Sequence, residues 1–322
     1  MGARIRLAAI LIGLVAASPL AAQETPEAPD LKTQRREYAA GEAAFRAGNF
    51  GDAYLRLLPL AQAEHAQAQL LMGRLSDNGL GPIALDPAEA FRWYLRAAQN
   101  GSGPARFAVA KAYATGRGVD ASAPLAVEWL TKASQADHVP AILALAALYR
   151  EGRGVNRDLA MAAKLERHAA DLGSPEAEFL LGERLQDGQG GTEKASKEML
   201  SRAAAAGHPG ALLRLGRITA SAPDAPPEER IHAFVYLTLA AQRGGDDVKR
   251  DAQQEIAAVK ATLSPEELAT AQTELRDWKP AQQLHPTAAA GDDDLLGLFS
   301  ANANAAKAGP PGKGKAAAPK RR

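Results

Sequence analysis

The stretch YREGRGVNRDLA, from Tyr149 to Ala160, carries two glycines one residue apart, Gly152 and Gly154. A Gly-x-Gly pair can open a phosphate-binding loop, or it can form a bare turn between two helices. The pair recurs in register at Gly79 and Gly81, Gly116 and Gly118, and Gly188 and Gly190. The second glycines lie 37, 36 and 36 residues apart. Self-similarity at such a period is typical of a stacked repeat protein, so we interpret all four pairs as turns.

Apolar residues recur at fixed distances from each turn, on both sides of it. Before the turns, a small residue stands at Gly73, Ala110, Ala146 and Gly182, each preceded by a larger one at Met72, Val109, Leu145 and Leu181. After the turns, one position is held by Trp93, Trp129, Leu165, Met199 and Tyr236, with a small residue four positions later. This spacing puts small and large residues on one stripe of a helix, so that neighbouring helices can approach closely. Each unit is therefore predicted to be a first helix, a glycine turn and a second helix.

Capping residues also fall in register. Asp86, Ser122, Asp158 and Thr192 stand where the second helices are expected to begin, and their oxygens can accept bonds from free N–H groups there. The first glycine of each turn is expected to take positive φ at the end of the first helix. Ser264 and Glu267 form a predicted capping box before a further helix near the C-terminus.

Three segments carry these columns most completely: Ala147–Gly173, Ala110–Ser134 and Asn78–Gly101. They resemble the Sel1-like repeat family, the longer-loop relatives of the tetratricopeptide repeats (TPR), and the resemblance covers roughly Gly41 to Trp278. It implies an all-α fold, a right-handed superhelical solenoid of TPR-like helix-turn-helix repeats that serves as a protein-interaction scaffold. Exported bacterial members of the family often regulate or assemble other envelope proteins.

The chain is expected to divide into five parts. Residues 1–22 read as a signal peptide, with Arg4 and Arg6 before an apolar run and a cleavage site near Ala22; an uncleaved membrane anchor is the alternative. Residues 23–40 form an N-terminal linker and helix start, and residues 41–245 form the solenoid. Residues 246–279 are expected to be capping helices, and residues 280–322, rich in Ala, Gly, Pro and Lys, to be a disordered tail. The predicted location is the bacterial periplasm.

No pattern typical of a catalytic site, a cofactor site or a metal site stands out. The position of the third glycine in a dinucleotide fingerprint is held by Arg157, and GPPGKGKA at Gly309–Ala316 lacks the Ser or Thr of a phosphate loop. His65, His138 and His208 share one repeat position with Ser102 and Ser174, and we interpret them as turn residues between helices. The chain has no cysteine. Its net charge of +1 does not indicate the basic surface that binding to nucleic acid requires. No cofactor and no metal are expected.

The leading hypothesis is a non-enzymatic adaptor that binds a protein or peptide of the cell envelope along an inner surface made by the first helices. The alternative is an envelope hydrolase or peptidoglycan-acting protein whose site is assembled across repeats. Predicted contact positions on the first helices are Arg74, Arg106, Lys111, Arg150, Glu183 and Arg217. A second candidate contact lies in the tail segment DDDLLGLFS, where Leu295, Leu296, Leu298 and Phe299 follow three aspartates and could dock on a partner, pack back on the solenoid or have no role.

Overall fold

The computed structural model describes residues 30–186, 192–221 and 225–281, and all regular secondary structure within these ranges is helical. The helices are α1 (Leu31–Arg46), α2 (Phe50–Gln62), α3 (Ala66–Asn78), α4 (Pro87–Gln99), α5 (Gly103–Thr115), α6 (Ala123–Ser134), α7 (Val139–Glu151), α8 (Leu159–Asp171), α9 (Pro175–Gln186), α10 (Glu193–Ala205), α11 (Pro209–Ala220), α12 (Pro227–Arg243), α13 (Asp246–Thr262) and α14 (Pro265–Asp277). The predicted all-α solenoid fold is confirmed. The predicted signal peptide and the tail beyond residue 281 lie outside the described residues.

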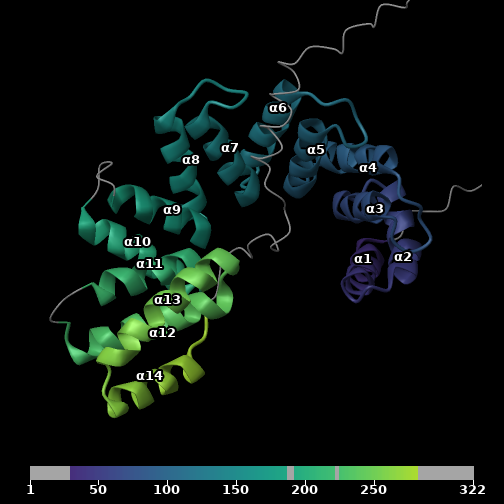
Figure 1. Ribbon diagram of the computed structural model, residues 1–322. Helices are drawn as coiled ribbons and strands as arrows, with labels where there is room; N and C mark the ends of the chain where they lie inside the picture. Colours follow the sequence, from purple (N-terminus) through teal and green to yellow (C-terminus); the bar gives the residue numbers. More distant parts are fainter. Residues whose placement is uncertain (1–29, 187–191, 222–224, 282–322) are drawn as a thin grey trace, which may run out of the picture.

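Consecutive helices pack against each other along the whole described chain, so that each pair contacts mainly the pair before and after it. The first helices of the five units, α3, α5, α7, α9 and α11, line the inside of an arc, and the second helices lie toward its outside (Figure 1). The hairpin of α1 and α2 precedes the first unit. At the other end α13 packs against α11 and α12, and α14 packs against α12, as expected for helices that close the stack.

The first glycine of each described turn ends a first helix in the left-handed conformation. Gly79, Gly116 and Gly152 have φ of 61°, 75° and 71°, and each N–H donates to a carbonyl in the last turn of its helix. A residue with a Cβ is strained in this region, which explains the choice of glycine. The fourth pair, Gly188 and Gly190, falls outside the described ranges.

The second glycine has an additional role that the repeat pattern did not predict. Gly118 has a φ of 76°, and a Cβ placed on it would lie 2.0 Å from the carbonyl oxygen of Pro87, at the start of α4 in the preceding unit. Gly81 is also close to Phe50 at the start of α2, where an added Cβ would lie 2.9 Å from the Phe50 Cβ. These two turns therefore rest on the N-terminus of the second helix before them, at a distance that only glycine allows. At Gly154 an added Cβ would meet only the Val127 side chain, at an ordinary 3.5 Å.

The predicted caps are confirmed in their hydrogen bonds. The side chains of Asp86, Ser122, Asp158 and Thr192 accept bonds from backbone N–H groups three residues on, at the starts of α4, α6, α8 and α10. Ser264 and Glu267 form both bonds of the capping box before α14. The shared position of His65, Ser102, His138, Ser174 and His208 is the N-cap of the first helix or, at Ser174, the residue that directly precedes it.

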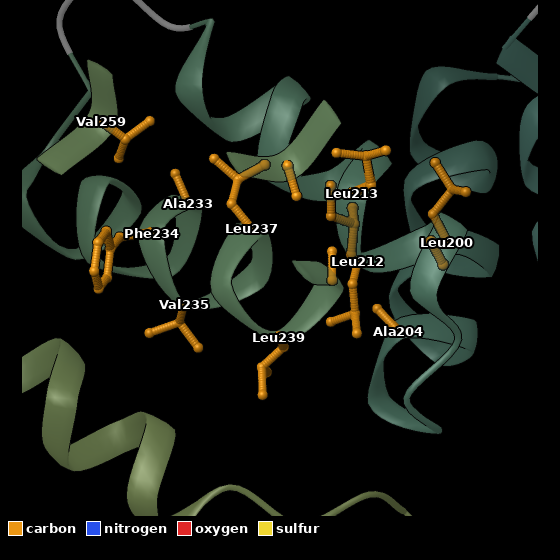
Figure 2. Packing of buried hydrophobic residues seen from close by; sticks show 14 of the residues in the cluster. Leu200, Ala204, Leu212, Leu213, Ala233, Phe234, Val235, Leu237, Leu239 and Val259 are labelled. Carbon is orange, nitrogen blue, oxygen red and sulfur yellow. The ribbon is translucent and has the colours of Figure 1, made fainter. Parts of the chain in front are cut away.

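The core is made by a small residue on each first helix that receives a large side chain from the second. A Cβ added to Gly73 would lie 2.4 Å from the ring of Tyr94. A Cβ added to Gly182 would lie 2.7 Å from Leu200, and one added to Gly216 would lie 2.7 Å from Leu237. Buried apolar residues form five clusters along the arc, and partly buried side chains such as Tyr113, Trp129 and Leu165 each pack against two of them. The cluster at the C-terminal end joins α10, α11, α12 and α13 through Leu200, Leu212, Leu237 and Val259 (Figure 2).

Substitution of the two glycine types by alanine should separate their roles. Gly152→Ala is expected to cost about 1–2 kcal/mol, because it places a Cβ in the left-handed region, where its nearest neighbour is the Arg157 Cβ at 3.1 Å, a tight contact without overlap. Gly118→Ala is expected to cost more, about 3 kcal/mol or above, because the new Cβ also overlaps the Pro87 carbonyl. Chemical denaturation of each variant measures both values.

Gly51→Ala is the matched control for these two variants. Gly51 lies in α2 with nothing within 4 Å of an added Cβ, so its replacement should be neutral or stabilising. Equal losses of stability at Gly118 and Gly152 would contradict the close approach inferred for the second glycine.

Candidate interaction surface

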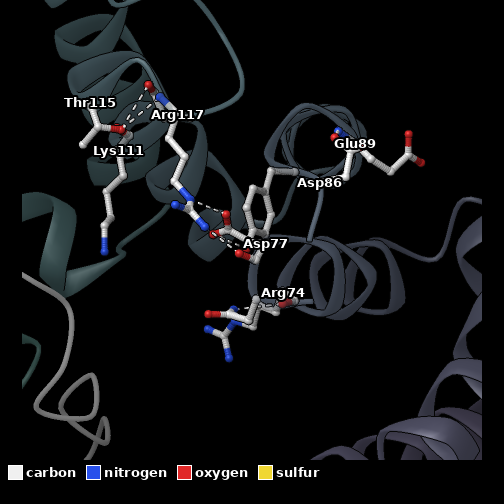
Figure 3. A network of polar contacts seen from close by, with 10 residues as sticks. Arg74, Asp77, Asp86, Glu89, Lys111, Thr115 and Arg117 are labelled. Carbon is white, nitrogen blue, oxygen red and sulfur yellow. Dashed lines mark hydrogen bonds and ion pairs between the residues drawn. The ribbon is translucent and has the colours of Figure 1, made fainter. Parts of the chain in front are cut away.

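Two of the predicted contact residues, Arg74 and Lys111, lie on first helices and are exposed to different degrees. Arg74 is exposed on α3, and Lys111 is half-buried on α5. Near them, the Arg117 side chain reaches back to the preceding unit, where its Nε donates to Asp77 Oδ1 at 2.6 Å and its Nη2 to the Asp77 carbonyl at 2.6 Å. In Figure 3 the Lys111 side chain points away from the contact between Arg117 and Asp77. The basic groups of α3 and α5 therefore lie beside, and not inside, the contact that joins the first two units.

Arg106 lies at a position that the other units fill with buried residues. Its Nε donates to the carbonyl of Ala98 and its Nη1 to the carbonyl of Lys132, each at 3.3 Å. These carbonyls belong to the last turns of α4 and α6, where a cation stabilises the negative end of the helix dipole. The structure therefore uses Arg106 to join α5 to the second helices on both sides.

Arg150 lies at a charged junction between the third and fourth units, which we define as Arg150 of α7, Glu166 of α8 and Arg184 of α9. The Glu166 side chain is fully buried, and Arg150 Nη1 lies 3.4 Å from its Oε1. Arg184 pairs with the other carboxylate oxygen of Glu166, Oε2, and the Arg184 side chain is 16% exposed. Burial, and secondarily the charge of Arg150, lowers the pKa of the Arg184 guanidinium. The junction thus holds two cations against one carboxylate.

The repeat register shows what the charged junction replaces. Glu166 occupies the position that Tyr94, Leu130, Leu200 and Leu237 hold in the other units, all of them buried. Arg184 occupies the position held by the buried residues Leu75, Ala112 and Leu148 in the first three units. An ion pair therefore stands at two core positions across one unit boundary. The repeat columns of the sequence contain this signal, because both residues break an otherwise apolar column.

Glu183 and Arg217 also contact other elements of the fold. Glu183 Oε1 lies 2.9 Å from Arg214 Nε, which joins α9 to α11. Arg217 Nη2 lies 3.1 Å from Asp251 and its Nε 2.7 Å from Glu255, which joins α11 to α13. These three carboxylates and both arginines remain about one third exposed or more, so each contact contributes modestly to stability.

The remaining predicted contacts, Leu295, Leu296, Leu298 and Phe299, lie outside the described residues. Within the described ranges, no group of three or more His, Cys, Asp or Glu side chains is placed to hold a metal ion. In the same ranges, none of the helices has the length and apolarity needed to cross a membrane.

His208 illustrates the polar contacts at the N-caps. Its Nδ1 accepts from the Ala211 N–H at 3.2 Å, its Nε2 lies 2.7 Å from Glu176 Oε2, and its ring stacks on Phe179 with centroids 4.7 Å apart. The hydrogen bond from His208 lowers the pKa of the Glu176 carboxyl from its ordinary value of 4.5. The contact joins the start of α9 to the start of α11.

The charged junction gives a test by substitution. Arg184→Leu alone is expected to destabilise the chain by about 3–5 kcal/mol, because Glu166 would stay buried with only the longer contact to Arg150. Glu166→Leu with Arg184→Leu should restore the stability or exceed it, because a leucine fits this core position in other units. Thermal and chemical denaturation of the two variants and of Glu166→Leu complete a double-mutant cycle. Additive losses would contradict direct coupling of the pair.

The pKa of Glu176 predicts a pH dependence. The pKa of the Glu176 carboxyl is lower in the folded state than in the unfolded state. The ionised carboxylate therefore stabilises the fold above about pH 4.5, and this stabilisation is lost as the pH falls through the folded-state pKa. Glu176→Gln should therefore flatten the loss of stability as the pH falls below about 4.5. Glu198→Gln, at an exposed position of α10, is the control and should leave the slope unchanged. The effect should be small, since the Glu176 side chain is 48% exposed.

Comparisons with known proteins agree with this geometry. The Sel1 repeat model matches residues 66–102, 103–138, 139–174 and 175–208. A Sel1 repeat protein from Oxalobacter formigenes of known crystal structure is similar to this chain at 25% identity, with a TM-score of 0.60, over 76% of this chain and 98% of that one.

Two further solved structures share less with the chain. The protective antigen c5321 of uropathogenic Escherichia coli, which displays an SLR fold, is 23% identical over 76% of this chain and 60% of its own, with a TM-score of 0.40. The immunity protein Pa5087 from Pseudomonas aeruginosa is 17% identical over 71% and 88%, also with a TM-score of 0.40. No curated protein matches the chain. The repeat match and the helix pairs that coincide with it show that residues 66–208 of this chain are similar to four consecutive Sel1 repeats.

Proposed function

We propose that this protein is a non-catalytic interaction scaffold of the bacterial periplasm, which binds an envelope protein or peptide along the inside of its arc and regulates an envelope assembly or sensor. Sel1 repeats mediate protein–protein interactions, and four of them stand in the middle of this chain. The charged n-region, apolar run and small-residue site within residues 1–22 support export.

The observation that carries the proposal is the distribution of side chains along the first helices. Their buried stripes make the core, while Arg74 of α3 is exposed and Lys111 of α5 and Arg150 of α7 are half-buried. These three helices line the inside of the arc (Figure 1). A concave row of polar groups on rigid helices can contact an extended partner at several points. Because the helices are fixed by core packing, such a partner would bind with little reorganisation of the solenoid.

Affinity capture with the exported chain as bait tests the proposal. Periplasmic extract at physiological salt should yield a specific partner with the wild-type chain. Arg74→Glu combined with Lys111→Glu should weaken capture by about tenfold or more, because it reverses two charges on the inner surface. Surface charge reversal away from the core should leave the melting temperature nearly unchanged.

Lys164→Glu combined with Lys197→Glu is the matched control. These exposed lysines lie on the second helices α8 and α10, so the net charge changes equally while the inner surface stays intact. Equal loss of capture by both double variants would place the contact elsewhere. A chain that captures no specific partner from extracts of any compartment would remove the scaffold proposal.

A further inference from the structure

The charged junction leaves one positive charge without a partner among its three members. Arg150 and Arg184 share the single carboxylate of Glu166, and the Arg150 side chain is 37% exposed. Arg150 lies in the last turn of α7, one of the first helices, which line the inside of the arc (Figure 1). A second carboxylate arriving from solvent could therefore pair with Arg150 without moving Glu166. The chemistry of the junction favours an acidic ligand.

An apolar contact lies on the same stripe of α7. Leu143 precedes Arg150 by seven residues, which places the two side chains on one face about 10 Å apart along the helix. Leu143 is half-buried, so part of its side chain is open to a ligand. In an extended peptide, about 10 Å corresponds to three residues. A suitable ligand thus has an acidic residue and, three positions away, a large apolar one.

The chain itself contains a segment with this spacing. In DDDLLGLFS, Asp292–Ser300, Asp293 precedes Leu296 by three residues. The segment carries three negative charges and is followed by no further acidic residue before the end of the sequence. Its charge is complementary to the charged junction, and its leucines are complementary to Leu143.

The end of the described chain lies within reach of the junction. The Ala281 N–H donates to the carbonyl of Ala205 at 2.8 Å, which fixes this point at the end of α10. The junction is about two helix diameters away and about 15 Å along the axis of α9, a path of roughly 25 Å. The eleven residues from Ala281 to Asp292 span at most about 36 Å when extended. The connection is therefore long enough, and the local concentration of the segment would be high.

We propose that Asp292–Ser300 docks in cis on the inner surface at the charged junction, with an aspartate on Arg150 and a leucine on Leu143, and competes there with a partner protein. The inference rests on the inner surface being the binding surface proposed above. On this proposal, Asp292–Ser300 competes with a partner protein for the charged junction. A partner that binds at the same place must then also carry an acidic residue three positions from a large apolar one.

Distance measurements between two spin labels test the docking directly. The chain has no cysteine, so Asn156→Cys and Ala290→Cys in the full chain give labels at two chosen positions only. Docking predicts a narrow distance distribution with a mean of no more than about 30 Å. Replacing Asp292, Asp293 and Asp294 by Asn should broaden the distribution and lower the ratio of docked to undocked chains by about tenfold.

Two controls isolate the contact. Arg74→Gln removes an inner-surface cation from a distant unit and should leave the distribution narrow, whereas 0.5 M NaCl should broaden it. A mixture of chains that each carry one label should give no defined distance. A defined distance in that mixture alone would show docking on a second copy and overturn the proposal.

Two further outcomes bear on the proposal. A wild-type distribution as broad as that of the triple Asn variant would overturn docking. Stronger capture of a partner by the triple Asn variant than by the wild-type chain would support competition. A narrow distance without any captured partner would support docking while removing the scaffold proposal, so the two can fail separately.

Discussion

The structure depends on one repeated contact, the insertion of a large side chain from each second helix against a small residue of the first. Gly73, Gly182 and Gly216 have no room for a Cβ, because Tyr94, Leu200 and Leu237 occupy that space. The contact sets the spacing of the two helices, and thereby where each glycine turn and N-cap must lie. The second glycine then sets the spacing between units, since Gly118 rests on the backbone at the start of α4.

Within this regular pattern the charged junction is the one place among the described units where the central contact is ionic. A buried ion pair costs desolvation that a leucine would not, and it tolerates little change in geometry. Glu166 and Arg184 therefore make the boundary between the third and fourth units selective for one arrangement. The same exchange of a core leucine for a carboxylate leaves Arg184 and the partly exposed Arg150 sharing one negative charge.

Much of the fold could be predicted from the sequence, because its determinants are local and periodic. Glycine at positive φ, Asp, Ser and Thr at N-caps, and small residues at close contacts each follow from backbone geometry, and the repeat makes them visible. The contact between Gly118 and Pro87 could not be predicted in this way, because it joins two units through space. The outer limits of the helices were less clear as well: α1 begins at Leu31, inside the segment interpreted as linker and helix start.

The predicted contact residues show where sequence reasoning meets its limit. Position in the repeat indicated Arg74 and Lys111 as contact residues, and in the structure Arg74 is exposed and Lys111 half-buried. The same reasoning could not tell that Arg106 reaches the carbonyls of two neighbouring helices, or that Arg217 contacts α13. The sequence alone does not distinguish a charged side chain that faces solvent from one that contacts a residue several dozen positions away in the chain.

The division of the core into five clusters has a consequence for how the molecule responds to force and to heat. Since stabilising contacts are shared only between adjacent units, loss of one unit at an end leaves the rest of the stack intact. Under tension the arc should extend in discrete steps, one or two helix pairs at a time, and the order of those steps would report which boundary is weakest. Each boundary between units therefore responds to force independently of the others. Changing the residues at a single boundary would change the curvature of the arc.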